Sequence, residues 1–205
     1  MSMNVLRSDR RVHKTRHHIT SAFLSLCEKK EFETIVVRDI TDASDISRST
    51  FYTHFQDKYD LLEQIMKDKL AELLNLYENN KSRILGYVPH QEVPDPYFLL
   101  LFMHLSEQAT HYRVLLFHLP DSRFGDRMIE AVQHTIGQRV DNNRMDQKQP
   151  VPLDILLESM ASWIVGIVLT WLKQGMMYSP NYMAIQLSRI ASIGFYQAMS
   201  LKMHN

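Results

Sequence analysis

A short run of hydrogen-bonding side chains, residues 48–54, is the part of the sequence best suited to recognition chemistry. On an α-helix, Phe51 and Phe55 would lie about 40° apart and could anchor the helix to its own domain. The opposite side carries Ser49, Tyr52 and Thr53. Hydroxyl groups on an exposed helix face suit hydrogen bonds to the base edges and phosphates of DNA. The run therefore predicts a DNA-binding helix; a merely polar face of a helical bundle is the alternative.

Two short helices would position this run. Apolar residues at Val36, Val37, Ile40 and Ala43 predict a helix over residues 36–43, and a four-residue joint leads into a second helix over residues 48–55. Ser47 is placed to cap the second helix, because its hydroxyl can accept a hydrogen bond from an exposed backbone N–H. Two short helices joined by a tight turn are typical of a helix-turn-helix, whose second helix enters the DNA major groove.

Residues 40–62 also resemble the DNA-binding signature of the tetracycline-repressor-like (TetR/AcrR) family of bacterial transcription regulators, in the spacing Thr50-Phe51-Tyr52-x-His54-Phe55-x-x-Lys58-x-x-Leu61-Leu62. The resemblance covers residues 12–62 and implies that residues 47–54 form the recognition helix. By the resemblance, the positions that touch DNA are Arg38, Thr41, Ser47, Arg48, Ser49, Thr50, Tyr52, Thr53, His54 and Lys58. Lys58 matches a phosphate contact at the start of a helix, where backbone N–H groups also favour an anion.

Two glycines that are usual in this family are absent. Asp45 stands in the joint of the helix-turn-helix, and residues 32–35 carry no Gly after the first helix. Asp tolerates the left-handed backbone conformation better than most residues, so we expect the turn to survive at some cost in stability. Neither change removes a group that is expected to contact DNA.

The charge of the chain is balanced overall but uneven locally. The 205 residues include 23 Lys and Arg and 23 Asp and Glu, and 45% are hydrophobic, as in an ordinary globular protein. Residues 1–18 have a local charge of +4, from Arg7, Arg10, Arg11, Lys14 and Arg16 against Asp9. This basic arm could reach the minor groove or phosphates, or could be a disordered solubilising tail. With so little bulk positive charge, we expect weak binding to random DNA and strong reliance on a dimer.

The apolar periodicity predicts helices throughout the chain. The first carries Ile19 and ends near Lys30, a long one spans residues 58–79, and a linker covers residues 80–96. Further helices are predicted over residues 97–110, 112–118, 124–142, 153–174 and 181–203. The fold class is therefore all-α. An N-terminal three-helix DNA-binding domain with a basic arm would cover residues 1–60, and a helical ligand-binding and dimerisation domain residues 61–205.

The last two predicted helices suit a dimer interface. Residues 153–174 are apolar on two faces, and the last helix carries a seam of Met183, Leu187, Ile190, Gly194 and Leu201. Pairing both helices with their symmetry mates would give a four-helix interface, which the resemblance also implies. A dimer would also place two recognition helices on two half-sites of a palindromic operator.

A small-molecule effector pocket is expected in the C-terminal domain. Its candidate lining residues are Phe98, Phe102, His104, Phe117, Met160 and Trp163. Flexible Met side chains suit adaptable binding, with His104 as a polar contact. A plain core of aromatic residues and methionines is the alternative.

Several classes of function are not expected. We find no catalytic motif and predict no enzyme and no cofactor; the scattered His104, His111, His118 and His134 lack the spacing of a metal site. The single cysteine, Cys27, predicts a buried thiol in a reducing compartment. The longest strongly apolar run has 13 residues, whereas a span needs about 20, and no secretory signal is visible. We therefore expect a cytoplasmic protein with no membrane partner.

The sequence thus predicts a homodimeric, sequence-specific regulator that binds double-stranded DNA. The leading hypothesis is a repressor that an unknown small-molecule effector releases by shifting the dimer geometry. The alternative is a regulator whose C-terminal domain docks a partner protein and activates transcription.

Overall fold

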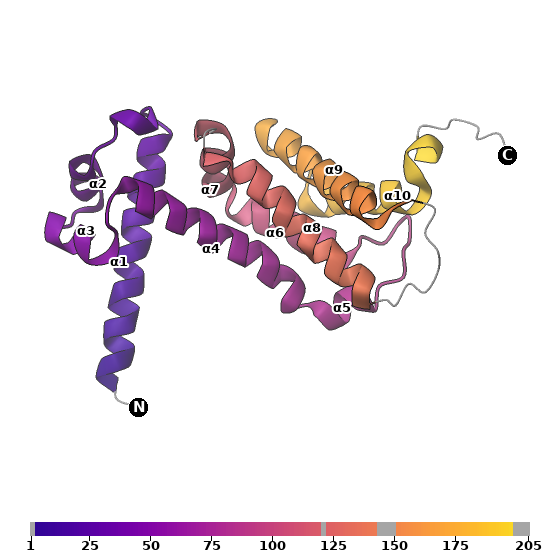
Figure 1. Cartoon of the computed structure of the whole chain (residues 1–205), viewed down its shortest axis with the longest axis horizontal. Helices are drawn as coiled ribbons and strands as arrows, with labels where there is room; N and C mark the ends of the chain where they lie inside the picture. The colour runs from indigo at the N-terminus through magenta and orange to yellow at the C-terminus, as the bar shows by residue number, and fades with distance from the viewer. Residues whose placement is uncertain (1–2, 120–121, 143–150, 199–205) are drawn as a thin grey trace. The chain divides into compact units, whose positions relative to one another are not determined.

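The chain folds into two compact units of α-helices in the computed structural model (Figure 1), which describes residues 3–119, 122–142 and 151–198. Residues 1–69 and 114–122 form one unit, and residues 70–113 and 123–205 form the other. Within the described ranges every regular element is helical, which confirms the all-α class. The helix α4 (Lys58–Glu78) begins in the first unit and ends in the second.

The first unit contains three helices around a small core. These are α1 (Met3–Cys27), α2 (Val37–Ser44) and α3 (Arg48–His54); the short turn η1 (Phe32–Thr34), the start of α4 and the π-helical turn η2 (Val114–His118) complete the unit. Helices α1 and α2 lie side by side. The fully buried core residues include Ile19, Phe23, Ile35, Ile40, Phe51 and Leu61. The predicted helices over residues 36–43, 48–55 and 58–79 are confirmed to within one residue at each end.

The helix α1 is longer than the sequence analysis predicted. It begins at Met3, so the basic stretch from residue 3 onward continues the helix and is not an extended arm. This segment has neither Gly nor Pro to interrupt a helix. At its other end Cys27 is 3% exposed, and burial raises the pKa of its thiol to about 12. The prediction of a buried thiol is confirmed.

The turn between α2 and α3 takes the left-handed conformation that was expected of Asp45. Its φ is 52° and its ψ is 49°, and the N–H of the next residue, Ile46, donates to the carbonyl of Thr41 at 3.1 Å. The predicted cap is also present, because the N–H of Thr50 donates to the hydroxyl of Ser47 at 3.1 Å. The helix-turn-helix joint therefore forms without glycine.

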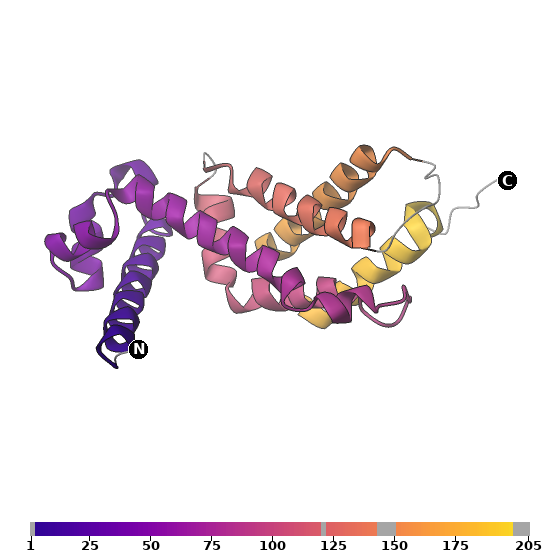
Figure 2. The same cartoon turned by 60° about the horizontal axis from the view of Figure 1, so that its bottom comes forward.

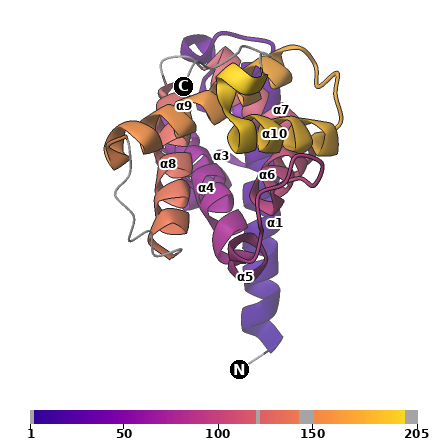
Figure 3. The same ribbon diagram turned by 90° about the vertical axis from the view of Figure 1, so that its right-hand side faces the viewer.

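Among its described residues, the second unit contains six further helices. They are α5 (Lys81–Leu85), α6 (Pro96–Glu107), α7 (Ala109–Arg113), α8 (Phe124–Asn142), α9 (Leu153–Lys173) and α10 (Pro180–Ala198). Helix α8 packs against α9, and α6 packs against α10; Figures 2 and 3 show these helices from two further sides. The predicted linker over residues 80–96 contains α5, and the helix predicted over residues 97–110 ends at Glu107, before α7 begins. Short helices of this kind carry too few apolar residues for a period to be read from sequence.

A buried ion pair joins three helices of the second unit. Asp95 caps α6 by accepting from the N–H of Tyr97 at 2.8 Å, and its other oxygen accepts from Arg139 of α8 at 2.7 Å. The N–H of Asp95 donates to the hydroxyl of Ser188 of α10 at 2.7 Å. Burial raises the pKa of the neighbouring Tyr97 to about 12. These contacts set the relative positions of α6, α8 and α10.

The two last helices differ from the sequence analysis in two respects. Helix α9 is long and apolar enough to cross a membrane, a test that the core helices of soluble proteins also pass. The count of 13 uninterrupted apolar residues in the sequence underestimated the length of this apolar helix. In α10, Gly194 has φ 76° and ψ 165°, which interrupts the helix. The predicted continuous seam is therefore wrong beyond Ile190, and Leu201 lies outside the described residues.

Candidate nucleic-acid interface

Helix α3 is anchored by aromatic side chains on its inner face. Phe51 is fully buried and Phe55 is 3% exposed, with their ring centroids 5.7 Å apart. The guanidinium of Arg16 lies 4.8 Å from the centroid of the Phe55 ring and donates to the side chain of Gln64. Arg16 thus holds α3 and α4 to α1 and is not part of a basic arm, a role that no local sequence pattern indicated.

The outer face of α3 carries most of the residues that were expected to touch DNA. Tyr52 is 57% exposed although it follows a buried phenylalanine. Of the ten residues expected to touch DNA, the exposed ones are Arg38, Ser47, Arg48, Ser49, Tyr52 and Thr53, and Thr50 and His54 are half-buried. The structure therefore brings eight of the ten predicted residues onto the helix-turn-helix with some surface each.

The hydroxyl groups of α3 are held in place by one another. The Ser47 hydroxyl lies 2.8 Å from the hydroxyls of Ser49 and of Thr50, and the Thr53 hydroxyl donates to the carbonyl of Ser49 at 2.9 Å. Because the N–H of Thr50 also donates to it, the Ser47 hydroxyl has used its one donor and both acceptor sites. The hydroxyls of Ser49, Thr50 and Thr53 can each still accept a hydrogen bond. Burial, and then the nearby charge of Arg16, lower the pKa of His54, which favours its neutral imidazole. The neutral ring can serve as a hydrogen-bonding group.

Two of the ten predicted residues lie elsewhere. Thr41 is 3% exposed and its hydroxyl donates to the carbonyl of Arg38 at 3.0 Å, so it belongs to the inner face of α2. The ammonium group of Lys58 donates to the carbonyl oxygens of Phe32 at 2.8 Å and of Glu33 at 3.0 Å. Its side chain is 12% exposed. The structure therefore places Lys58 in the junction between η1 and α4.

Aromatic rings complete the surroundings of Lys58. Its ammonium lies 4.6 Å from the centroid of the Phe32 ring and 5.2 Å from that of Tyr59, within the range of cation–π attraction. A hydrogen bond to the Glu33 carboxylate raises the pKa of the Tyr59 hydroxyl. The start of α4, where an anion was expected, is capped by the carboxylate of Asp57, which accepts from two backbone N–H groups at 2.8 Å. The chain thus supplies its own anion at this helix end.

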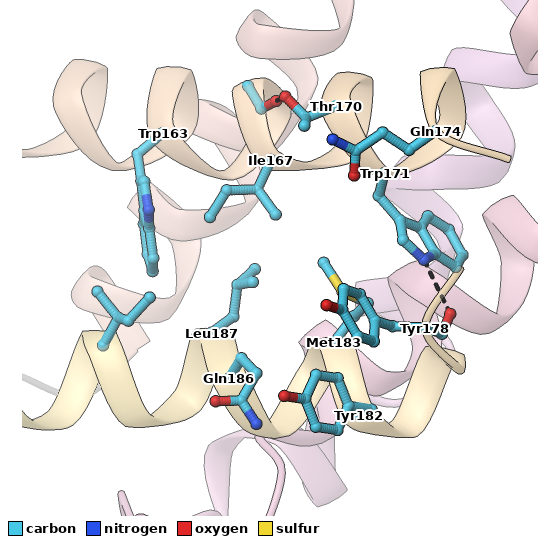
Figure 4. Close-up of a pocket in the computed structure, with 12 residues that line it drawn as sticks. Trp163, Ile167, Thr170, Trp171, Gln174, Tyr178, Tyr182, Met183, Gln186 and Leu187 are labelled. Carbon is cyan, nitrogen blue, oxygen red and sulfur yellow. Dashed lines mark hydrogen bonds between the residues drawn. The ribbon is translucent and has the colours of Figure 1, made fainter. Parts of the chain in front are cut away.

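The six residues expected to line an effector pocket are not brought together. Phe98 and Phe102 are buried in the core, Phe117 belongs to the first unit and Met160 is half-buried. His104 lies 2.8 Å from the hydroxyl of Tyr112. Trp163 lines a hollow of about 600 Å³ between α9 and α10 (Figure 4). The apolar period identified the faces of these helices but not the place where neighbouring helices leave space.

The hollow between α9 and α10 has an aromatic end that the sequence analysis missed. Tyr178 and Tyr182 stack with their ring centroids 4.9 Å apart, and the indole N–H of Trp171 donates to the carbonyl of Tyr178 at 2.9 Å (Figure 4). Tyr178 precedes α10, so helical periodicity could not have indicated this pair.

Two protein-family models match the chain in separate stretches. The one described as bacterial regulatory proteins of the tetR family matches residues 19–65, which include α2 and α3. The one described as a transcriptional regulator C-terminal region matches residues 92–192. The chain belongs to the tetR family of bacterial transcription regulators. The expectation that followed from the spacing around α3 is confirmed.

Two curated proteins resemble this tetR-family chain in part. It is 41% identical over 68 residues, 33% of its length, to an uncharacterized HTH-type transcriptional regulator, YxbF, of Bacillus subtilis (strain 168). It is 38% identical over 99 residues, 48% of its length, to the HTH-type dhaKLM operon transcriptional activator DhaS of Lactococcus lactis. The chain covers 18% of the length of YxbF and 47% of the length of DhaS.

Solved structures of the tetR family share the fold. A TetR transcriptional regulator from Streptococcus agalactiae 2603V matches with a TM-score of 0.62 at 22% identity, over 91% of this chain and 98% of that one. A dihydroxyacetone kinase operon activator, DhaS, matches with a TM-score of 0.59 at 20% identity, over 92% of this chain and 98% of that one. At these identities the likeness establishes the architecture alone.

Proposed function

We propose that the protein is a homodimeric, sequence-specific regulator that binds a palindromic operator in double-stranded DNA. The observation that carries the proposal is the outer face of α3, where Tyr52 is 57% exposed beside the exposed Arg48. A ring and a guanidinium on a rigid helix suit thymine methyl groups, base edges and phosphates. Residues 1–60 would bind DNA, and residues 61–205 would supply the dimer and the regulatory input, in the cytoplasm.

The test is binding to an operator selected from genomic fragments. We expect Tyr52→Ala and Arg48→Ala each to weaken binding about tenfold or more, because a good base contact contributes about 1–3 kcal/mol. Tyr52→Phe separates the contribution of the hydroxyl from that of the ring. Arg83→Ala removes an exposed arginine of α5 in the other unit and serves as the matched control. Unchanged binding by both Tyr52→Ala and Arg48→Ala would refute the assignment.

The proposed dimer uses the faces of α9 and α10 that border the hollow. On α9 the inward stripe of Ile164, Val168 and Leu172 is fully buried, whereas Trp163 and Ile167 remain half-buried. A second apolar stripe at the surface of one chain suits a partner copy. The stacked Tyr178 and Tyr182, 51% and 46% exposed, extend this surface.

Gly166 provides a test of the dimer that spares the fold. A Cβ atom at Gly166 would meet nothing within 4 Å in a single chain, and the residue lines the hollow. Gly166→Glu should therefore leave the helical content unchanged, because Glu favours a helix more than Gly does. It should convert the dimer to a monomer in light scattering, because it places a charge in the interface. Gly166→Ala is the control that should remain dimeric, and a dimeric Gly166→Glu protein would contradict this interface.

Two regulatory inputs are proposed for the C-terminal unit. The first is a repressor released by a small molecule that favours a dimer geometry unable to match the operator. The second is an activator that docks another protein, which the partial identity to the activator DhaS supports. Thermal shifts against a metabolite library distinguish them: a stabilising metabolite that also releases DNA supports the first, and a co-purified protein with a flat library screen supports the second.

A further inference from the structure

The first unit contains a cavity that the DNA-binding proposal does not use. It has a volume of about 710 Å³ and lies between the η1 turn and the start of α4 on one side and His118, Leu119 and Ser122 on the other. Its apolar lining consists of Phe32, Tyr59, Leu62, Met66 and Leu119. A volume of this size is typical of sites for small organic molecules.

The polar groups of this cavity are mainly carboxylates. Glu31, Glu33 and Glu63 line it together with His118 and Ser122, and neither Lys nor Arg is among the lining residues. Lys58 lies 4.0 Å from Glu33, and Lys67 lies 3.5 Å from Glu63. In the part of the chain that the structure describes, the Glu31 carboxylate has no ion pair. The cavity is therefore negative on balance, with two lysines against three carboxylates.

The chemistry of this lining selects one class of ligand. A neutral apolar molecule would desolvate the carboxylates without replacing their contacts with water, and an anion would be repelled. The described residues contain no group of three His, Cys, Asp or Glu side chains placed to hold a metal ion. An organic cation with an aromatic or apolar body would fill the cavity and keep its charge near the carboxylates. Phe32 and Tyr59 already face one ammonium, that of Lys58, so these rings suit a cation.

We propose that this cavity is a binding site for a lipophilic organic cation within the DNA-binding unit. The site is separate from the hollow between α9 and α10, and binding there is independent of whether the protein recognises an operator. A bound cation would contact the η1 turn and α4, the two elements that Lys58 joins.

The probe is tetraphenylphosphonium, with tetraphenylborate as an ion of the same shape and opposite charge. In sodium buffer we expect calorimetry to detect binding of the cation and a rise in the Tm of the whole chain, and neither for the anion. The double variant Glu31→Gln/Glu63→Gln should lower the affinity for the cation about five- to tenfold, as expected for the loss of two partly exposed charge pairs. Both side chains reach the surface, so the fold should tolerate the change.

Two matched variants locate the site. Glu107→Gln removes an exposed carboxylate of α6 in the other unit and should leave the affinity unchanged. Tyr178→Ala opens the hollow between α9 and α10 and should also leave it unchanged. Equal binding of tetraphenylborate, full affinity in the Glu31→Gln/Glu63→Gln variant, or loss of binding in Tyr178→Ala would each overturn the proposal.

Discussion

Replacing Lys58 by Met is expected to destabilise the protein without changing its contacts to DNA phosphates. Met keeps an unbranched stem, so the change chiefly removes the ammonium group. That group donates to the carbonyls of Phe32 and Glu33 at 2.8 and 3.0 Å, and the side chain is 12% exposed. Hydrogen bonds to a charged group contribute about 1.5–3 kcal/mol each. Because some water still reaches the site, we expect the free energy of unfolding to fall by about 2–4 kcal/mol.

The same variant tests the phosphate contact that the family resemblance implies for Lys58. Two of the three ammonium N–H donors are used by carbonyl oxygens, and the Glu33 carboxylate lies 4.0 Å away. Each phosphate contact contributes about 0.9 to the slope of log affinity against log salt concentration, so a dimer would lose about 1.8 if both lysines made one. With the ammonium engaged as the structure shows, the slope should be unchanged.

The assays are urea denaturation at one fixed protein concentration and operator binding by fluorescence anisotropy at several salt concentrations. Lys67→Met is the matched control on the same helix, because Lys67 is 68% exposed and its ammonium lies 3.5 Å from the carboxylate of Glu63 one turn away. We expect it to change the free energy of unfolding by less than about 0.5 kcal/mol. If Lys58→Met left the stability unchanged and reduced the slope of log affinity against log salt concentration, the structural role would be refuted and the phosphate contact supported.

Three further predictions concern stability. Asp45→Gly should stabilise the protein by about 0.5–1 kcal/mol in urea denaturation and Asp45→Ala should destabilise it by about 1 kcal/mol, because the backbone there is left-handed; equal effects would contradict this. Arg139→Met should lower the free energy of unfolding by about 3–5 kcal/mol by leaving the Asp95 carboxylate buried without its cation, and Arg139→Met/Asp95→Asn should recover part of it. Cys27 should resist iodoacetamide at pH 8.5 until the protein unfolds. Since its pKa is about 12 in the fold and about 9 for a free thiol, the folded state holds the proton longer, and stability should fall as pH rises from 9 to 12.

The helix-turn-helix was the most predictable part of the molecule because its determinants are local. The spacing of Phe51 and Phe55 fixed the inner face of α3, and Ser47 and Asp45 carry their cap and turn conformations within four residues. Lys58 could not be placed in this way, because its partners lie 25 and 26 residues earlier in the chain.

The lining residues of an effector pocket were hard to choose from sequence for a related reason. Helical periodicity states which side of a helix is apolar, and both a filled core and a cavity satisfy it. Phe102 proved to be fully buried against Trp171, with ring centroids 5.0 Å apart, whereas Trp163 borders open space. The difference depends on how three helices meet, which no single segment encodes. The ion pair between Arg139 and Asp95, 44 residues apart in the sequence, helps to position the helices of this unit.

The helix α4 has a practical consequence for anyone who exchanges units between relatives of this protein. Its 21 residues contain neither Gly nor Pro, and the helix begins in one unit and ends in the other (Figure 2). In a chimera joined within α4, helical phase matters more than length. One inserted residue would turn the later residues of α4 by about 100° around the helix axis, whereas seven would restore their face to within about 20°. The number of residues inserted into or removed from α4 in such a chimera should therefore correspond to whole helical turns.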